Sequence, residues 1–228
     1  DYLEKIEDID VLYNLGLRST NPVWNNQNKF GGGTRTDNKV GLTRLGEKLI
    51  EKLVKKRIAI DLSHANERTF FDIINLCKGM KKQGEEPIVF ASHSNSRTLC
   101  DVPRNLTDEQ IIAIKEFNGV IGVVSIITFC VNTNDICNPN IDYEQKYVEH
   151  INYIKNLLGG VDNISVATDD MKYYYIEPEY YQNINVFPHY SVKEKLTKVL
   201  IKNNYTEKEI KRILEDNFKE KILFLLMY

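Results

Sequence analysis

The sequence has 228 residues, of which 42% are hydrophobic and 27% are charged, a composition typical of a globular protein. Thirty basic and 32 acidic residues leave a formal charge of −2, which gives no electrostatic reason to expect nucleic acid or an anionic membrane as a partner. No stretch reaches the roughly 18 apolar residues that a membrane-spanning helix needs. Four cysteines are too few for a disulfide scaffold in this chain and leave the compartment open, with a preference for a reducing one such as the cytoplasm.

Helical and strand-like segments alternate along the chain. The chain begins at Asp1 instead of a methionine, and apolar residues with helical spacing occur from its first residues on. We therefore expect further sequence upstream. The predicted strands are residues 17–24, 57–63, 87–92, 119–127 and 163–168. The predicted helices lie within residues 42–53, 67–78, 107–117 and 143–158, with two more after the capping boxes that open at Ser191 and Thr206. Residues 27–40 and 172–188 are predicted loops, the second rich in tyrosine.

The fold class follows from the character of the predicted strands. Strands this apolar are buried on both faces, which predicts a parallel sheet covered by helices. The connections are long enough for right-handed crossovers between parallel strands. We therefore predict an α/β fold, with residues 1–228 forming a single partial (β/α)8 TIM-barrel domain, represented by about five of eight units. An open doubly wound sheet is the alternative.

Two histidines end two of the apolar strands. Residues 58–62 lead into Ser63-His64, and residues 88–91 lead into Ser92-His93. Polar residues at the carboxyl ends of parallel strands build the sites of (β/α) barrels, and neutral imidazole is a good zinc ligand. The alternative is that each histidine only satisfies backbone groups at a strand end. Because both occur in the same local setting, we expect His64 and His93 to bind metal and the TIM barrel to be of the metal-dependent hydrolase type.

Three further residues are candidates for the same site. Asp169 follows the fifth strand, where a carboxyl group can pass a proton to the leaving nitrogen of an amide; the alternative is an Asp pair that opens a loop. Arg104 can bind a substrate carboxylate through two hydrogen bonds, or it is a surface loop arginine. Trp24, predicted at the end of the first strand, lines a pocket or fills the core. His150 and His189 are interpreted as structural.

The chain resembles the renal dipeptidase (membrane dipeptidase) family of zinc peptidases along nearly its whole length. The matching segments are Leu12–Arg18, Val23–Asn25, Gly41–Thr43, Ile60–His64, Ala91–Arg97, Pro103–Gln110, Gly119–Gly122 and Asp216–Phe218. The most specific part is the Ser-His-Ser-Asn segment that leads to Pro-Arg-Asn-Leu-Thr.

This resemblance implies a zinc-dependent dipeptidase with two zinc ions, which hydrolyses the peptide bond of a dipeptide by a metal-bound hydroxide. His64 and His93 would bind one zinc ion, Arg104 would hold the free carboxylate of the dipeptide, and Trp24 would also contact the substrate. Asp169 would pass a proton to the leaving amine. A disulfide between Cys100 and Cys130 is an alternative to two thiols, and a homodimer is an alternative to a monomer.

The sequence also departs from the family pattern. The His-x-Asp ligand pair and the metal-bridging Glu of the family have no counterpart after Asp1, so we expect this chain to be the carboxyl-terminal portion of a longer protein and inactive by itself. Trp24 stands where many members have a substrate-binding histidine. Thr168–Lys172 replaces the usual Ser-Asp-Phe-Asp-Gly, which makes Asp170 an alternative to Asp169 as the acid/base. These departures motivate a rival hypothesis, a catalytically inactive barrel that binds a ligand or partner; an amidohydrolase acting on a lactone or phosphoester is a third.

Overall fold

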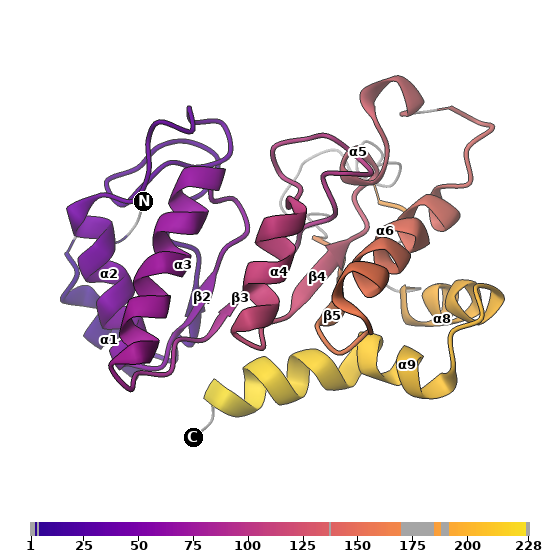
Figure 1. Ribbon diagram of the computed structural model, residues 1–228. Helices are drawn as coiled ribbons and strands as arrows, with labels where there is room; N and C mark the ends of the chain where they lie inside the picture. The colour runs from indigo at the N-terminus through magenta and orange to yellow at the C-terminus, as the bar shows by residue number, and fades with distance from the viewer. Residues whose placement is uncertain (1–2, 4, 137, 170–184, 188–191, 227–228) are drawn as a thin grey trace. The chain divides into compact units, whose positions relative to one another are not determined.

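The computed structural model describes residues 3, 5–136, 138–169, 185–187 and 192–226. The chain divides into two compact units (Figure 1). The first unit comprises residues 1–91, 113–119 and 220–228, and the second comprises residues 92–112 and 120–219. The tyrosine-rich stretch, Asp170, His189 and Ser191 lie outside the described residues.

The first unit contains a three-stranded parallel sheet in the order β1-β2-β3. Its strands are β1 (Ser19–Thr20), β2 (Ala59–Asp61) and β3 (Val89–Phe90). The register places Thr20 opposite Ile60, and Asp61 opposite Phe90. All residues of β2 and β3 are buried, as the apolar character of these strands predicts.

Two amphipathic helices cover this sheet and lie side by side in Figure 1. The helix α2 (Arg44–Lys55) begins where the Thr43 side chain accepts the Gly46 N–H, and α3 (Glu67–Lys82) begins where the Asn66 side chain accepts the Thr69 N–H. A shorter helix, α1 (Asp8–Asn14), lies near the start of the chain.

The first strand is much shorter than the predicted range 17–24. Pro22 has no N–H to donate to a neighbouring strand, and the Asn21 side chain donates to the Ser63 carbonyl at 3.0 Å where main-chain pairing has ended. The prediction that Trp24 ends this strand is therefore wrong, because the residue lies in the loop that follows.

The second unit contains a parallel pair, β4 (Ile121–Val124) and β5 (Ile164–Ala167), with Ile121 opposite Ile164. The helix α6 (Tyr143–Leu158) packs on both strands and ends at Gly159, whose φ of 73° is the left-handed conformation that terminates helices. The buried Tyr147 hydroxyl donates to the Val123 carbonyl at 2.8 Å, which ties this helix to β4.

The remaining elements of the second unit follow the predicted order with two additions. A short helix α5 (Ile127–Cys130) and a 3-10 turn (Thr133–Asp135) occur where the sequence predicts only the end of a strand and a loop. The helices α8 (Val192–Lys202) and α9 (Glu207–Lys211) follow β5, and Thr206 forms the predicted capping box with Glu209. A π-helical stretch (Arg212–Asp216) continues α9 and contacts β5.

The helix α4 (Asp108–Glu116) begins at the capping box predicted from the sequence. Thr107 N–H donates to the Gln110 side chain at 2.9 Å, and Gln110 N–H donates back to the Thr107 hydroxyl at 3.3 Å. The α/β class is confirmed, each of the five predicted strands has a counterpart, and the strands within each unit pair in parallel. Within the described residues, no helix combines the length and the apolar character needed to cross a bilayer.

A neutral histidine lies inside the second unit. His150 on α6 is fully buried; its Nδ1 accepts the Ser96 N–H at 3.2 Å, and its Nε2 lies 3.1 Å from the Cys130 carbonyl oxygen. These two contacts require a neutral ring with its proton on Nε2. Burial lowers the pKa of His150 from 6.5 to about 4, mainly because the charged ring would lose its hydration.

We expect the free energy of unfolding to fall by about 3 kcal/mol between about pH 7 and about pH 4 because of His150 alone. In this window the unfolded chain binds a proton that the folded chain rejects; above it both states are neutral at this residue, and below it both are protonated. Urea denaturation at several pH values measures the change. The variant His150→Gln should lose this part of the pH dependence, and equal slopes for the two proteins would refute the assignment.

Candidate functional site

His64 lies three residues beyond the end of β2 in the first unit. Its Nδ1 is 2.9 Å from the Asn25 amide oxygen, which can only accept a hydrogen bond. Nδ1 therefore carries the proton of the neutral ring, and Nε2 keeps the lone pair that a metal ligand needs. The ring is half-buried, and the hydrogen bond to Asn25 orients it.

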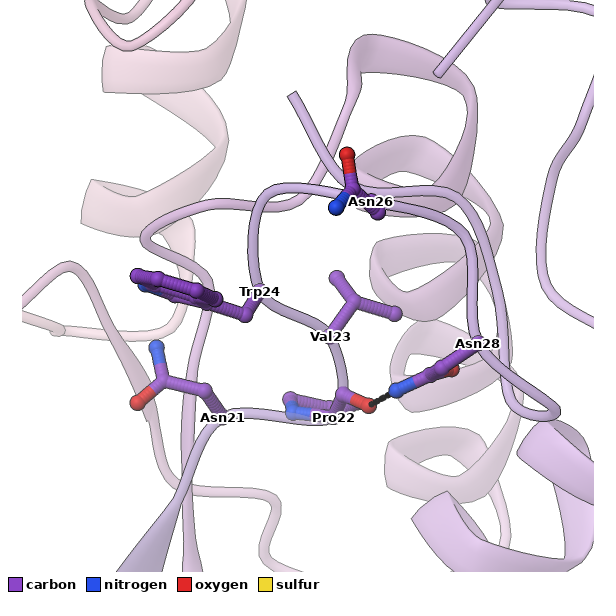
Figure 2. Close-up of a pocket in the computed structure, with 6 residues that line it drawn as sticks. All are labelled: Asn21, Pro22, Val23, Trp24, Asn26 and Asn28. Carbon is purple, nitrogen blue, oxygen red and sulfur yellow. Dashed lines mark hydrogen bonds between the residues drawn. The ribbon is translucent and has the colours of Figure 1, made fainter. Parts of the chain in front are cut away.

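Trp24 belongs to the same part of the first unit. Its ring centroid is 5.9 Å from that of His64, and its side chain is 65% exposed, which rules out the alternative of core filling. Trp24 and its neighbours enclose a pocket of about 120 Å³, around which the loop curves in Figure 2. The lining residues are Asn21, Pro22, Val23, Trp24, Asn26 and Asn28. The loop is closed by a hydrogen bond from the Asn28 amide to the Pro22 carbonyl at 2.9 Å.

His93 and Arg104 belong to the second unit, where the structure brings them together. Arg104 Nη2 donates to the main-chain carbonyl of His93 at 3.0 Å, and the guanidinium lies 5.4 Å from the centre of the Phe129 ring. The His93 Nδ1 is 2.5 Å from the Ser92 hydroxyl. Because a hydroxyl can accept, this contact is compatible with the same Nδ1-protonated ring that His64 has.

Asp169 follows β5 in the second unit, and its side chain is exposed. Among the described residues it has no hydrogen bond to His93 or to Arg104. The alternative acid, Asp170, is outside the described residues. Asp169 therefore lies at the predicted strand end, with an exposed carboxyl group.

Backbone conformation marks two of the predicted site residues. Five non-glycine residues of the described chain have positive φ. Three of these, Arg57, Asn118 and Asn204, follow helix ends, where a left-handed residue terminates the helix. The other two, His64 (φ 71°) and Asp169 (φ 46°), follow strands β2 and β5 instead. Strained backbone gathers at functional sites, so this conformation supports a functional role independently of side-chain chemistry.

Cys100 and Cys130 are separate buried thiols, and the structure contains no disulfide between them. The Cys100 thiol donates to the Val131 carbonyl at 3.2 Å, and the Cys130 thiol contacts the Val124 carbonyl at 3.5 Å. Loss of hydration, assisted by the nearby Asp101 charge, raises the pKa of Cys100 to about 11, and burial raises that of Cys130 well above its ordinary value. Neither thiol is an activated nucleophile.

Asn25 and Ser92 have no role in the sequence-based prediction, yet they contact the Nδ1 atoms of the two predicted metal ligands. Ser92 is adjacent to its histidine and could have been suspected, but Asn25 is 39 positions from His64 and only the fold pairs them. Within the described residues, no group of three or more His, Cys, Asp or Glu side chains could hold a metal ion. A catalytic zinc site needs three protein ligands, so two imidazoles alone do not complete one.

Comparisons with known proteins show where the chain belongs. The sequence pattern of the membrane dipeptidase family, peptidase family M19, matches residues 2–220. A protein from the PQQ-III 3′ region of Acinetobacter calcoaceticus is 39% identical over 127 residues, covering 53% of this chain and 38% of that protein. A protein from the pqqA 5′ region of Klebsiella pneumoniae is 35% identical over 170 residues, covering 71% of this chain and 58% of that protein.

A solved structure shows a similar fold. The metallopeptidase of Rhodobacter sphaeroides, liganded with a phosphinate mimic of the dipeptide L-Ala-D-Ala, matches with a TM-score of 0.75 at 24% identity, covering 97% of this chain and 58% of that one. The matches thus span between about two fifths and three fifths of the length of these three proteins. Because the family pattern covers nearly the whole sequence, the chain belongs to the membrane dipeptidase family, peptidase family M19.

Proposed function

We propose that this protein is a metal-dependent dipeptidase that hydrolyses the peptide bond of a dipeptide. Residues 1–228 would form a single partial domain that supplies about five of the eight units of a (β/α)8 barrel. Family membership supports the reaction class, and the dipeptide mimic bound by the Rhodobacter sphaeroides metallopeptidase supports the substrate class.

The matched setting of the two histidines carries this proposal. In the parallel pairing of β2 with β3, Asp61 lies opposite Phe90, and His64 and His93 each follow their strand end by three residues. In each case a neighbouring oxygen contacts Nδ1, from Asn25 for His64 and from Ser92 for His93. This arrangement suits Nε2 as the metal-binding nitrogen of both rings.

The chemistry of the donor set favours zinc, since neutral imidazole is among its preferred ligands. Zinc, as two ions in the complete site, would supply a hydroxide nucleophile near neutral pH and polarise the substrate carbonyl. His64 and His93 would hold one of the ions. The described residues contain no complete ligand set, so the complete site would need further ligands.

Three other residues have proposed roles in binding and proton transfer. Arg104 would bind the free carboxylate of the dipeptide, since its guanidinium is already held beside the His93 main chain and the Phe129 ring. Asp169 would hold the proton that the leaving amine receives. Trp24 would contact the substrate, because its exposed indole lines a pocket and its ring lies 5.9 Å from that of His64.

Metal removal tests this function on the full-length protein. We expect exhaustive treatment with a chelator to abolish hydrolysis of dipeptides, and added zinc to restore it, because the attacking hydroxide depends on the metal. Metal content measured by mass spectrometry should be about two zinc ions per chain. Full activity after the metal has been removed would reject the proposal. A full-length protein that binds no stoichiometric metal and hydrolyses no dipeptide would instead support the rival hypothesis of an inactive binding protein.

A further inference from the structure

The loop of residues 92–106, which carries His93 and Arg104, is held by two buried asparagines in the second unit. The exposed fractions of Asn95 and Asn105 are 0% and 1%. A buried amide is costly unless its donors and acceptors are paired, so the contacts of these two side chains show what they do.

Asn95 pairs with the edge of β4. Its Oδ1 accepts the Val124 N–H at 2.8 Å, and its Nδ2 donates to the Val124 carbonyl at 3.0 Å. The side-chain amide thus pairs with both main-chain groups of Val124, as a neighbouring strand would. On the same edge, Ser94 N–H donates to the Gly122 carbonyl at 2.9 Å. Gly122 is required for this close approach, because a Cβ there would lie 2.0 Å from the Ser92 carbonyl oxygen.

Asn105 joins the end of the loop to its beginning and to α5. Its Oδ1 accepts the Asn95 N–H at 3.2 Å, and its Nδ2 donates to the Cys100 and Phe129 carbonyls, both at 2.9 Å. Asn95 Nδ2 also donates to the Phe129 carbonyl, at 3.0 Å. The two amides therefore converge on one main-chain oxygen of α5.

The two asparagines themselves lie close in the sequence to two proposed site residues. His93 precedes Asn95 by two positions, and Arg104 directly precedes Asn105. Arg104 donates to the His93 carbonyl and lies over the ring of Phe129, whose carbonyl the two amides share. Any displacement of Asn105 would therefore move the backbone from which Arg104 extends.

We propose that Asn95 and Asn105 are positioning residues, which set the places of His93 and Arg104 relative to β4 and α5. The inference rests on the proposed function for the roles of those two residues. Active-site side chains need a rigid supporting shell, because small misplacements cost much of the rate. The two buried amides supply that shell from main-chain groups of β4 and α5, without contacting the substrate themselves.

Substrate selectivity is the first test, in the full-length protein. The measured quantity is kcat/KM for a dipeptide divided by kcat/KM for the same dipeptide with an amidated carboxyl end. We expect Asn105→Ala to lower this ratio about 10-fold, because Arg104 would no longer be held in place. The matched control is Asn217→Ala, since Asn217 is also buried and donates to two carbonyls, those of Val161 and Ile164, at 2.7 Å each. These contacts lie at the amino-terminal end of β5, where Ile164 pairs with Ile121. Asn95 instead pairs with Val124, at the carboxyl-terminal end of β4, so Asn217→Ala should not change the ratio.

Amide hydrogen exchange is the second test and needs neither metal nor activity. In the metal-free protein, we expect exchange in residues 93–106 to be about 10-fold faster in Asn95→Ala and Asn105→Ala, and unchanged in Asn217→Ala. If Asn95→Ala does not fold, Asn105→Ala, which keeps the pairing of Asn95 with Val124, decides the question. Wild-type exchange in this segment, or a selectivity change no larger than that of the control, would overturn the inference. A wild-type protein that hydrolyses no dipeptide would instead overturn the proposed function.

Discussion

Replacing His64 or His93 by alanine should lower dipeptide hydrolysis by the full-length protein at least about 100-fold and reduce its bound zinc. Loss of a residue that only orients a ligand costs about 10- to 100-fold in metal affinity or activity, so loss of the ligand itself should cost more. The His93 substitution leaves the main-chain carbonyl that accepts from Arg104, so the loop retains this contact. Activity assays and metal analysis of the purified variants measure both effects.

The backbone at His64 offers a sharper form of this experiment. Its φ of 71° is one that asparagine adopts more readily than most residues, so His64→Asn should fold with little loss of stability. We nevertheless expect it to lose zinc and activity as His64→Ala does. Thermal unfolding of the metal-free proteins separates folding from binding. Full zinc content in these variants would show that the two histidines are not ligands, whatever their activity.

The sequence predicts the order of elements well because each depends on local chemistry. The capping boxes at Thr107 and Thr206 lie where the structure begins helices, since a side chain that accepts a backbone N–H acts within a few residues. The position where α3 ends depends on packing as well as on local sequence. The glycine at position 79 suggests an end near Lys78, but the helix continues to Lys82 because Met80 is buried on its apolar face. Tertiary packing overrides the glycine there.

The candidate site is only partly readable from the sequence. Strand-end histidines can be found because an apolar run followed by a polar residue is visible in one dimension. The residues that orient and support them are not, because Asn25 reaches His64 and Asn95 reaches β4 across 39 and 29 positions. Burial of asparagine is also unusual, so the composition of the 92–106 loop suggests an exposed segment. Only the fold shows that its amides are enclosed.

Replacing Arg104 by alanine should weaken recognition of the substrate carboxylate selectively. A hydrogen bond to a charged group contributes about 1.5–3 kcal/mol, so kcat/KM for a dipeptide should fall about 10- to 100-fold more than kcat/KM for its amidated form. Loss of the contact with the His93 carbonyl would affect both substrates alike, and the ratio of the two therefore isolates the carboxylate contact. Steady-state kinetics with matched dipeptide and dipeptide-amide pairs give this ratio.

Arg97 provides a matched control from the same loop. Its guanidinium also donates to main-chain carbonyls, those of Asn105 at 3.0 Å and Pro103 at 3.3 Å, and it has no proposed substrate contact. Arg97→Ala loosens the backbone on both sides of Arg104 but keeps the Arg104 guanidinium, so it should lower the ratio less than Arg104→Ala does. Arg104→Lys should recover only part of the selectivity, because lysine keeps the charge but lacks the planar pair of donors. If Arg104→Ala and Arg97→Ala affect both substrates equally, the carboxylate of the substrate is bound elsewhere, and a substrate without a free carboxylate becomes the better hypothesis.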